Sequence, residues 1–288
     1  MGKKEDLAFG GQAVIEGVMM RSKHYVAVSV RSKGKIVSKV EKLKRMPNFA
    51  DYIFVRGIVN LFRMLVVGIR ALIWSADQQL EKEEKISKWE VAWTMAIAFG
   101  AAILLFIILP YYLTTLTQTR GVIFNLIDGV IRVVVFIAYL LLISLMKDVN
   151  VLFQYHGAEH MAVHAYEAGK KLTPDNVKKF STRHPRCGTS FILIVLVISI
   201  IVFSFITSES NLVKILARIV LIPVIASVSY ELLKLTARFQ KSRIVRLLSL
   251  PGLWIQKITT RKPGKRQIEV AIRALKLVIG REKHHEKA

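Results

Sequence analysis

Four apolar segments of the sequence are long enough to form helices that cross a membrane. They cover about residues 92–113, 122–146, 190–208 and 212–235. About 20 helical residues are needed to cross a hydrocarbon core about 30 Å thick. Only short polar connections separate the first segment from the second and the third from the fourth, which predicts two tight helical hairpins. The pattern therefore predicts a mainly α integral membrane protein with about four transmembrane helices.

A further apolar segment at residues 53–76 carries an arginine at every seventh position, namely Arg56, Arg63 and Arg70. Residues seven apart lie on one face of a helix, so the arginines form a polar stripe. Holding three arginines in hydrocarbon would cost several kcal/mol in total. The segment is therefore predicted to be an amphipathic helix in the membrane interface or a re-entrant helix, and a spanning helix is the alternative.

The two ends of the chain have different patterns. Residues 25–32 alternate apolar and polar side chains, KGK supplies a turn, and IVSKVEKL alternates again, which predicts a small N-terminal β unit. The basic C-terminal region is predicted to break at Pro251-Gly252 and at Pro263-Gly264. Residues 267–280 then place apolar side chains at helical spacing, which predicts an amphipathic helix that lies on the membrane or packs beneath it.

These elements divide the chain into six consecutive segments of different character. They are an N-terminal β unit (1–50), an interfacial helix with a polar lead-in (51–90), a first transmembrane hairpin (91–146), a cytoplasmic loop (147–189), a second transmembrane hairpin (190–236) and a basic amphipathic tail (237–288).

The composition supports a basic membrane protein. Hydrophobic residues make up 53% of the 288-residue chain, too many for a disordered protein or a collagen. The 43 Lys and Arg residues outnumber the 20 Asp and Glu residues, and the net charge is +23. Because apolar runs of membrane-spanning length interrupt the basic residues, anionic lipid headgroups are the expected partner and nucleic acid is not expected.

The distribution of basic residues predicts the orientation in the membrane. Lys and Arg cluster before the first predicted span, between the second and third, and after the fourth. Positively charged segments remain on the cytoplasmic side, so both termini and the 147–189 loop are predicted to be cytoplasmic. The only cysteine, Cys187, cannot form an internal disulfide, and the first residues lack the apolar stretch of a signal peptide.

The candidate chemistry lies in the string QYHGAEHMAVHAYEAGK, which begins the predicted cytoplasmic loop. His156 and His160 are four residues apart and so lie on adjacent turns of one helix face, the spacing that binds one metal ion. H-x-x-E-H is the inverted zinc-protease pattern, in which the glutamate activates water. We therefore predict a divalent metal, with zinc the first candidate, held by the two histidines, and Glu159 as the general base.

A catalytic zinc ion needs a third protein ligand. His164 and Glu167 lie on the same helix face, but a straight helix rarely surrounds a tetrahedral ion, so a ligand from another segment is also expected. The candidates elsewhere in the chain are His184, Cys187, Glu231 and Glu16. The alternative interpretation is that the histidines are solvated or contact headgroups.

Each of the distant candidates has a simpler interpretation as well. Arg183 and Arg186 would lower the pKa of a Cys187 thiolate, while an ordinary turn with an inert thiol is the alternative. A nucleophilic Cys187 with a histidine base is a lesser alternative. Glu16 lies in the glycine-rich string GGQAVIEGVMMR, which also fits a tight turn feeding a strand. Glu231 can instead pair with a cation such as Lys234.

A few charged residues fall inside the predicted spans. Asp128 and Arg132 are four residues apart and are predicted to neutralise each other on one helix face. Lys214 and Arg218, at the start of the fourth span, are predicted to extend outward to the membrane surface.

Three strings in order, GGQAVIEGVMMR, FQYHGAEHMAVHAYE and HPRCGTSF, resemble the signature of the bacterial YqhQ-like membrane proteins, a family built on a domain of unknown function. The resemblance covers most of the chain and implies a metal-dependent enzyme of the bacterial inner membrane. The positions of this sequence that carry the match are Gln12, Glu16, His156, Glu159, His160, Glu167, His184 and Cys187.

Two main hypotheses follow for the function. The first is a metal-dependent hydrolase whose site lies at the cytoplasmic membrane face, within reach of peptide bonds or lipid-linked esters. The second is a membrane scaffold or assembly factor that binds anionic lipid and protein partners, with any metal purely structural. Metal transport is a third hypothesis, although the spans contain few polar groups to form a path.

Overall fold

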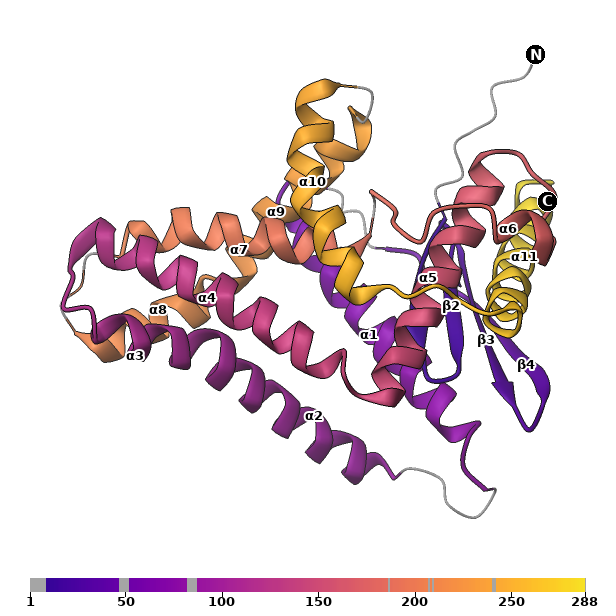
Figure 1. The fold of residues 1–288 in the computed structure, drawn as a ribbon, viewed down its shortest axis with the longest axis horizontal. Coiled ribbons are helices and arrows are strands. Elements are labelled where there is room, and N and C mark those ends of the chain that lie inside the picture. Colours follow the sequence, from indigo (N-terminus) through magenta and orange to yellow (C-terminus); the bar gives the residue numbers. More distant parts are fainter. Residues whose placement is uncertain are drawn as a thin grey trace.

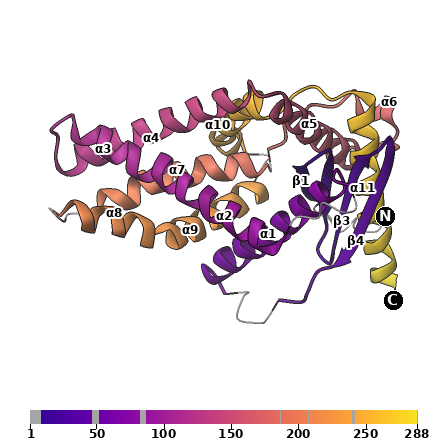
Figure 2. The same ribbon diagram turned by 90° about the horizontal axis from the view of Figure 1, so that it is seen from below.

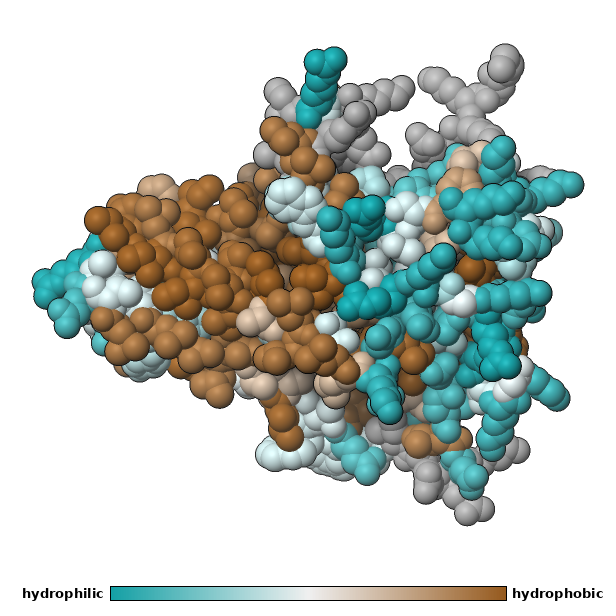
Figure 3. Space-filling view, in the orientation of Figure 1, coloured by the Kyte–Doolittle hydropathy of each residue, from teal (hydrophilic) through white to brown (hydrophobic). Residues whose placement is uncertain are grey.

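The molecule has a helical half and a half that contains a β-sheet (Figure 1). The computed structural model describes residues 9–46, 52–81, 87–185, 187–206, 208, 210–239 and 242–287. Hydrophobic residues cover the helical half in Figure 3, and hydrophilic residues cover most of the other half. The protein is mainly helical, as the sequence predicts.

Four antiparallel strands form the sheet, in the order β1-β2-β3-β4. Their bounds are Gly10–Val14 (β1), Gly17–Arg21 (β2), Tyr25–Ser32 (β3) and Lys35–Lys42 (β4). The predicted hairpin is β3–β4 and is confirmed. The glycine-rich string forms a second hairpin, β1–β2, which turns at Glu16 with a φ of 50°. Sequence analysis expected only one strand there.

The helices follow in chain order. Their bounds are Val55–Asp77 (α1), Lys88–Ile103 (α2), the π-helical turn Leu104–Ile108 (η2), Leu109–Thr115 (α3), Gly121–Ile143 (α4), Lys147–Glu167 (α5), Pro174–Val177 (α6), Gly188–Ser204 (α7), Asn211–Val220 (α8), Ile222–Arg238 (α9), Arg243–Thr259 (α10) and Lys265–Lys287 (α11).

Among the described residues, three helical segments are long and apolar enough to cross a membrane. They are α1, the continuous run Lys88–Thr115 and α4. The α8–α9 pair becomes a fourth if its 43° bend is allowed within one span. The predicted span at 190–208 is shorter than expected, because α7 has 17 residues and so a length of about 25 Å. The predicted span at 212–235 is broken before Pro223, which lacks the N–H of a regular helix.

Helix α1 covers one face of the sheet. Ala71 packs in a cluster with Val14, Met19 and Val30 from the strands. Further exposed apolar side chains lie along the same helix, including Ile58, Leu61, Phe62 and Leu65. The face of α1 that carries Ala71 therefore packs on the sheet, whereas other apolar positions of the helix are exposed.

The opposite face of the sheet carries the main core. Helices α5 and α11 pack there, so α1 and α11 lie on opposite sides of the sheet (Figure 2). The predicted apolar stripe of the tail is buried in this core, with Ile268, Ala271 and Leu275 among its members. The N-terminal β unit, the histidine helix and the C-terminal tail therefore share one hydrophobic core. The predicted break at Pro263-Gly264 is confirmed, but α10 runs without interruption through Pro251-Gly252, so that predicted break is wrong.

A buried charge cluster joins the helices of the apolar half. Arg132 donates to Asp128 over 2.7 Å, which is the predicted pair. Arg218 does not extend outward as predicted: its side chain is 1% exposed and lies 3.3 Å from the same carboxylate. The guanidinium also stacks over the ring of Tyr111 at 4.7 Å. The carboxylate and the aromatic ring therefore replace the solvent that the arginine would otherwise seek.

Candidate metal centre

Two glycines allow close packing around the histidine helix α5. A Cβ on Gly157 would lie 2.3 Å from the carbonyl oxygen of Arg261, so only glycine lets the chain after α10 cross α5 there. The Arg261 amide donates to the carbonyl of Phe153 over 2.9 Å. On the strand side, a Cβ on Gly11 would lie 3.1 Å from the Cγ of Glu159. The end of α10 is thereby held over His156, and strand β1 over Glu159.

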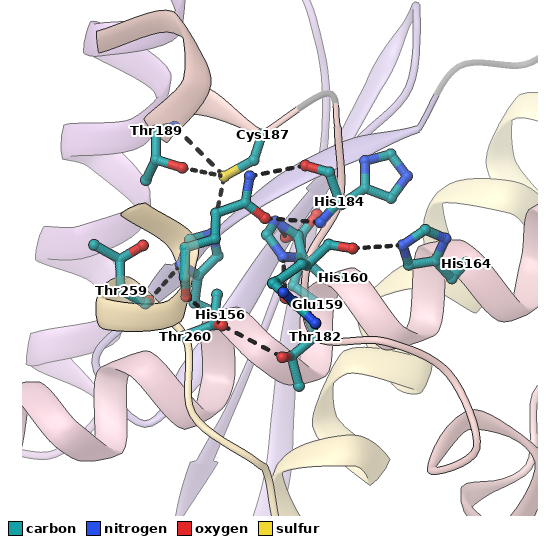
Figure 4. Close-up of polar contacts among 12 residues, drawn as sticks. His156, Glu159, His160, His164, Thr182, His184, Cys187, Thr189, Thr259 and Thr260 are labelled. Atoms are coloured by element: carbon teal, nitrogen blue, oxygen red, sulfur yellow. Dashed lines mark hydrogen bonds and ion pairs between the residues drawn. The ribbon is translucent and has the colours of Figure 1, made fainter. Parts of the chain in front are cut away.

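Both histidines of the H-x-x-E-H pattern are oriented by backbone carbonyls (Figure 4). The Nδ1 atom of His156 donates to the carbonyl oxygen of Thr259 over 2.8 Å. The Nδ1 atom of His160 donates to the carbonyl oxygen of Thr182 over 2.6 Å. A neutral imidazole that donates from Nδ1 has its lone pair on Nε2. The two Nε2 atoms are therefore the ones that can bind a metal.

Cys187 completes a group with these two histidines. Its Sγ lies 3.2 Å from the Nε2 atom of His156, and the Thr189 hydroxyl and amide donate to it at 3.3 and 3.4 Å. Burial raises the pKa of the Cys187 thiol to about 11. The predicted lowering of this pKa is therefore wrong, because desolvation of the thiolate outweighs the hydrogen bonds from Thr189 that would lower it. Arg186, one of the two arginines in that prediction, lies outside the described residues. Without a metal, the thiol donates to His156.

The potential ligand atoms of His156, His160 and Cys187 all lie within 4.8 Å of one another. Glu159 lies beside this group, with Oε2 at 3.4 Å from the Nε2 atom of His160. Burial raises the pKa of the Glu159 carboxyl to about 7, although the neighbouring His156 and the Gly11 amide act in the opposite direction. Glu159 is thus a buried acid that titrates near neutral pH.

A second group contains His164, Glu167 and His184, again with ligand atoms within 4.8 Å of one another. His184 Nε2 lies 3.3 Å from Glu167 Oε2, and His164 Nε2 donates to the carbonyl of Arg183 over 2.9 Å. The buried side chain of Gln256 holds the backbone of His184 at both its N–H (2.7 Å) and its carbonyl (2.9 Å). Sequence analysis missed Gln256, since one glutamine in a basic helix carries no distinguishing signal.

The two remaining ligand candidates have other partners. Glu231 accepts from the Nε atom of Arg56 over 2.6 Å, so its predicted cation partner is an arginine of α1 and not Lys234. Glu16 accepts from the hydroxyl of Tyr155 over 3.1 Å. Neither carboxylate belongs to the two ligand groups formed by described residues. Of the candidates outside α5, Cys187 is therefore the one whose potential ligand atom lies near those of both His156 and His160.

The raised pKa of Glu159 predicts a pH dependence of stability in the metal-free protein. The unfolded chain loses this proton near pH 4.5 and the folded protein near pH 7, so the folded state binds more protons between these values. The free energy of unfolding should therefore fall as pH rises through this window, by about 3 kcal/mol from this group. Thermal unfolding of metal-free wild type and Glu159→Gln across pH 5 to 8 measures the difference.

Burial also lowers the pKa of His160 and of His184. Their contribution to the free energy of unfolding therefore rises with pH, opposite to that of Glu159. Both proteins share those histidines, so only the difference between wild type and Glu159→Gln reports the carboxyl. Parallel pH profiles of the two proteins would contradict the assignment of a raised pKa to Glu159.

Comparison with known proteins identifies the family. Residues 53–281 match the family described as Protein of unknown function (DUF1385). The chain is also 31% identical to the Uncharacterized protein YqhQ of Bacillus subtilis (strain 168) over 295 positions, which cover 92% of this chain and 90% of that protein. No solved structure matches the chain. Neither description names a metal, a substrate or a reaction. Because the family match covers most of the sequence, the chain belongs to the DUF1385 family, as the YqhQ-like motifs predict.

Proposed function

We propose that this protein is a metal-dependent membrane hydrolase that holds zinc through His156, His160 and Cys187 at the cytoplasmic face of the bacterial inner membrane. The observation that carries the proposal is the convergence of two carbonyl-anchored imidazoles and a thiol on one small volume. A histidine that donates its other ring nitrogen to a carbonyl is the usual arrangement around protein zinc.

The donor set fits zinc better than other common metals. Imidazole and thiolate are ligands that zinc prefers, whereas magnesium and calcium prefer oxygen ligands. The three donors come from two separate segments, α5 and the N-cap of α7. They can therefore surround an ion, which a single straight helix cannot do.

Glu159 is the proposed acid–base group of the reaction. Zinc held here would supply Lewis-acid polarisation and lower the pKa of water toward about 7. Hydrolysis adds hydroxyl to the carbonyl carbon of a peptide or ester and a proton to the leaving group. Glu159 would accept that proton from water on a carboxylate oxygen and deliver it to the leaving atom. Its position beside His160, with Oε2 at 3.4 Å from Nε2, would place the carboxylate next to water at the ion.

The arrangement of the apolar half supports insertion through two hairpins. The Tyr111 hydroxyl donates to the Asn211 side chain over 2.6 Å, so the turns after α3 and before α8 lie at the same end (Figure 1). The ligand groups belong to the opposite, polar half. We infer that α1 lies in the interface rather than across the membrane, because one of its faces packs on the sheet. Anionic headgroups would then contact the basic cytoplasmic half, and both termini would be cytoplasmic.

The burial of the proposed zinc centre favours a second candidate function, in which the zinc is structural. His160, Cys187 and Glu159 are all buried, and the Glu159 carboxylate, which lies 3.4 Å from the Nε2 atom of His160, would become a fourth ligand if it moved toward the ion. A closed set of four protein ligands is typical of structural zinc. In that case the protein would be a scaffold or assembly factor for lipid and protein partners.

Glu159→Gln distinguishes the two functions. The hydrolase predicts that the variant keeps its zinc, because the three ligands are unchanged, while hydrolysis falls by about 10²- to 10⁴-fold, the usual contribution of a general acid–base group. Zinc content and hydrolysis of a panel of membrane peptides and lipid-linked esters should be measured on the same full-length preparations. Zinc bound to the wild type without hydrolysis of any panel member, or equal rates in both proteins, would favour the scaffold.

A further inference from the structure

Four histidine rings form a continuous row beside the proposed zinc centre. Their centroids are 4.4 Å apart for His156 and His160, 5.8 Å for His160 and His184, and 4.4 Å for His184 and His164. In Figure 4 the rings of His160 and His184 lie between those of His156 and His164. The row therefore connects the Cys187 end of the site with Glu167.

The two ends of this row are more exposed to solvent than its middle, and the Glu167 end is the most exposed. His160 and His184 are buried, with 2% and 5% of their surface exposed, whereas the Glu167 side chain is 35% exposed. His156 and His164 are both half-buried, so the exposed carboxylate makes the Glu167 end the one that dissolved metal reaches most readily. At the other end, Cys187 is buried, and its sulfur contacts His156 and Thr189.

The solvent-facing end has the donors of a metal site in its own right. His164 donates from Nε2 to the Arg183 carbonyl, so its ring presents a lone pair at Nδ1. The Gln256 side chain fixes the backbone of His184 on both sides, which positions that ring next to Glu167. Two imidazoles and one carboxylate form a ligand set that zinc and similar divalent cations accept with an open position.

We propose that His164, Glu167 and His184 form a second, solvent-facing divalent-cation site, and that this site loads the buried centre through the row of imidazoles. The loading step rests on the proposed function, whereas the second site does not. The two groups share no ligand, and paired-metal catalysis usually places two ions about 3.5–4 Å apart in one site. The arrangement therefore corresponds to two separate sites, an entry site and a destination.

Cobalt(II) substitution separates the two sites by their spectra. Cys187 is the only cysteine of the chain, so thiolate-to-cobalt charge transfer reports the buried centre alone. Cobalt bound to His164, Glu167 and His184 contributes ligand-field absorption without charge transfer. The full-length, metal-free protein in mild detergent should be titrated as wild type, as His164→Ala/Glu167→Gln, and as the control His284→Ala, which changes an exposed histidine of α11.

We expect wild type and the control to bind two equivalents of cobalt, and the double variant to bind one with full charge transfer. The undiminished charge-transfer band also establishes that the variant is folded. At substoichiometric cobalt, charge transfer should develop about tenfold more slowly in the variant, the low end of the effect of residues that support a metal site without binding its ion.

Other outcomes are equally decisive. One equivalent with charge transfer and identical loading rates in all three proteins would overturn the second site and leave the buried centre intact. Cobalt binding that lacks charge transfer and disappears in the double variant would support the second site, but would refute the buried centre and the loading step. Two equivalents in the variant would assign the second ion to other ligands and overturn the proposal.

Discussion

Asp128→Asn should lower the free energy of unfolding by about 3–5 kcal/mol, the usual cost of removing one partner from a buried ion pair. The Asp128 carboxylate faces two guanidiniums, at 2.7 Å from Arg132 and 3.3 Å from Arg218. All three side chains are at most 6% exposed. Neutralising the one carboxylate leaves two positive charges together in a region without solvent. Chemical unfolding of the purified protein in detergent measures the change.

Arg132→Met is the matched control for this prediction. It removes one of the two positive charges and leaves Asp128 paired with Arg218, so the cluster becomes neutral. We expect it to cost clearly less than Asp128→Asn. Equal costs for the two variants would contradict the electrostatic interpretation. Metal flux into vesicles that is lost in Asp128→Asn but kept in an equally destabilised variant would instead revive metal transport.

His156→Ala/His160→Ala should abolish zinc binding at the buried centre and the stability that this zinc ion confers. A ligand present at 1,000 times its dissociation constant stabilises the folded state by about 4 kcal/mol. Wild type should therefore unfold at a lower temperature after chelation, and the double variant should lose the part of this shift that comes from the buried centre. Thermal unfolding with and without chelator, together with elemental analysis of protein purified without a metal-affinity tag, measures both effects.

Glu231→Gln is the informative control for that experiment. Sequence analysis includes Glu231 among the ligand candidates, but its carboxylate accepts from Arg56 on α1. The variant should keep its zinc and its response to the chelator. Loss of zinc from Glu231→Gln at unchanged folded yield would argue against the ligand set of His156, His160 and Cys187.

The spacing of apolar residues predicted those helices and strands whose pattern depends only on their own stretch of sequence. The β3–β4 hairpin, the apolar helices near 92–113 and 122–146, and the amphipathic tail helix are all present. The common core of the N-terminal sheet, α5 and α11 was not predictable, because it joins segments far apart in the sequence. The same applies to Arg218, whose burial depends on Asp128 from another helix.

Helical spacing also predicted which imidazoles share a face of α5, and the structure places His156 and His160 there with Glu159 beside them. It could not choose among the distant ligand candidates, since that choice depends on where the chain before α7 returns. The carbonyls of Thr182 and Thr259 orient the rings, and backbone groups leave no mark in a sequence. The pKa of Cys187 was mispredicted because charged neighbours are visible in a sequence while burial is not.

The most direct test of the proposed zinc centre is X-ray absorption spectroscopy at the zinc edge, on full-length protein loaded with one equivalent of zinc. The ligand set predicts one sulfur at about 2.3 Å together with imidazole nitrogens at about 2.0–2.1 Å. The sulfur shell should disappear in Cys187→Ser while the imidazole signal remains. A wild-type spectrum with only nitrogen and oxygen ligands would contradict the account, because zinc would then be bound away from Cys187.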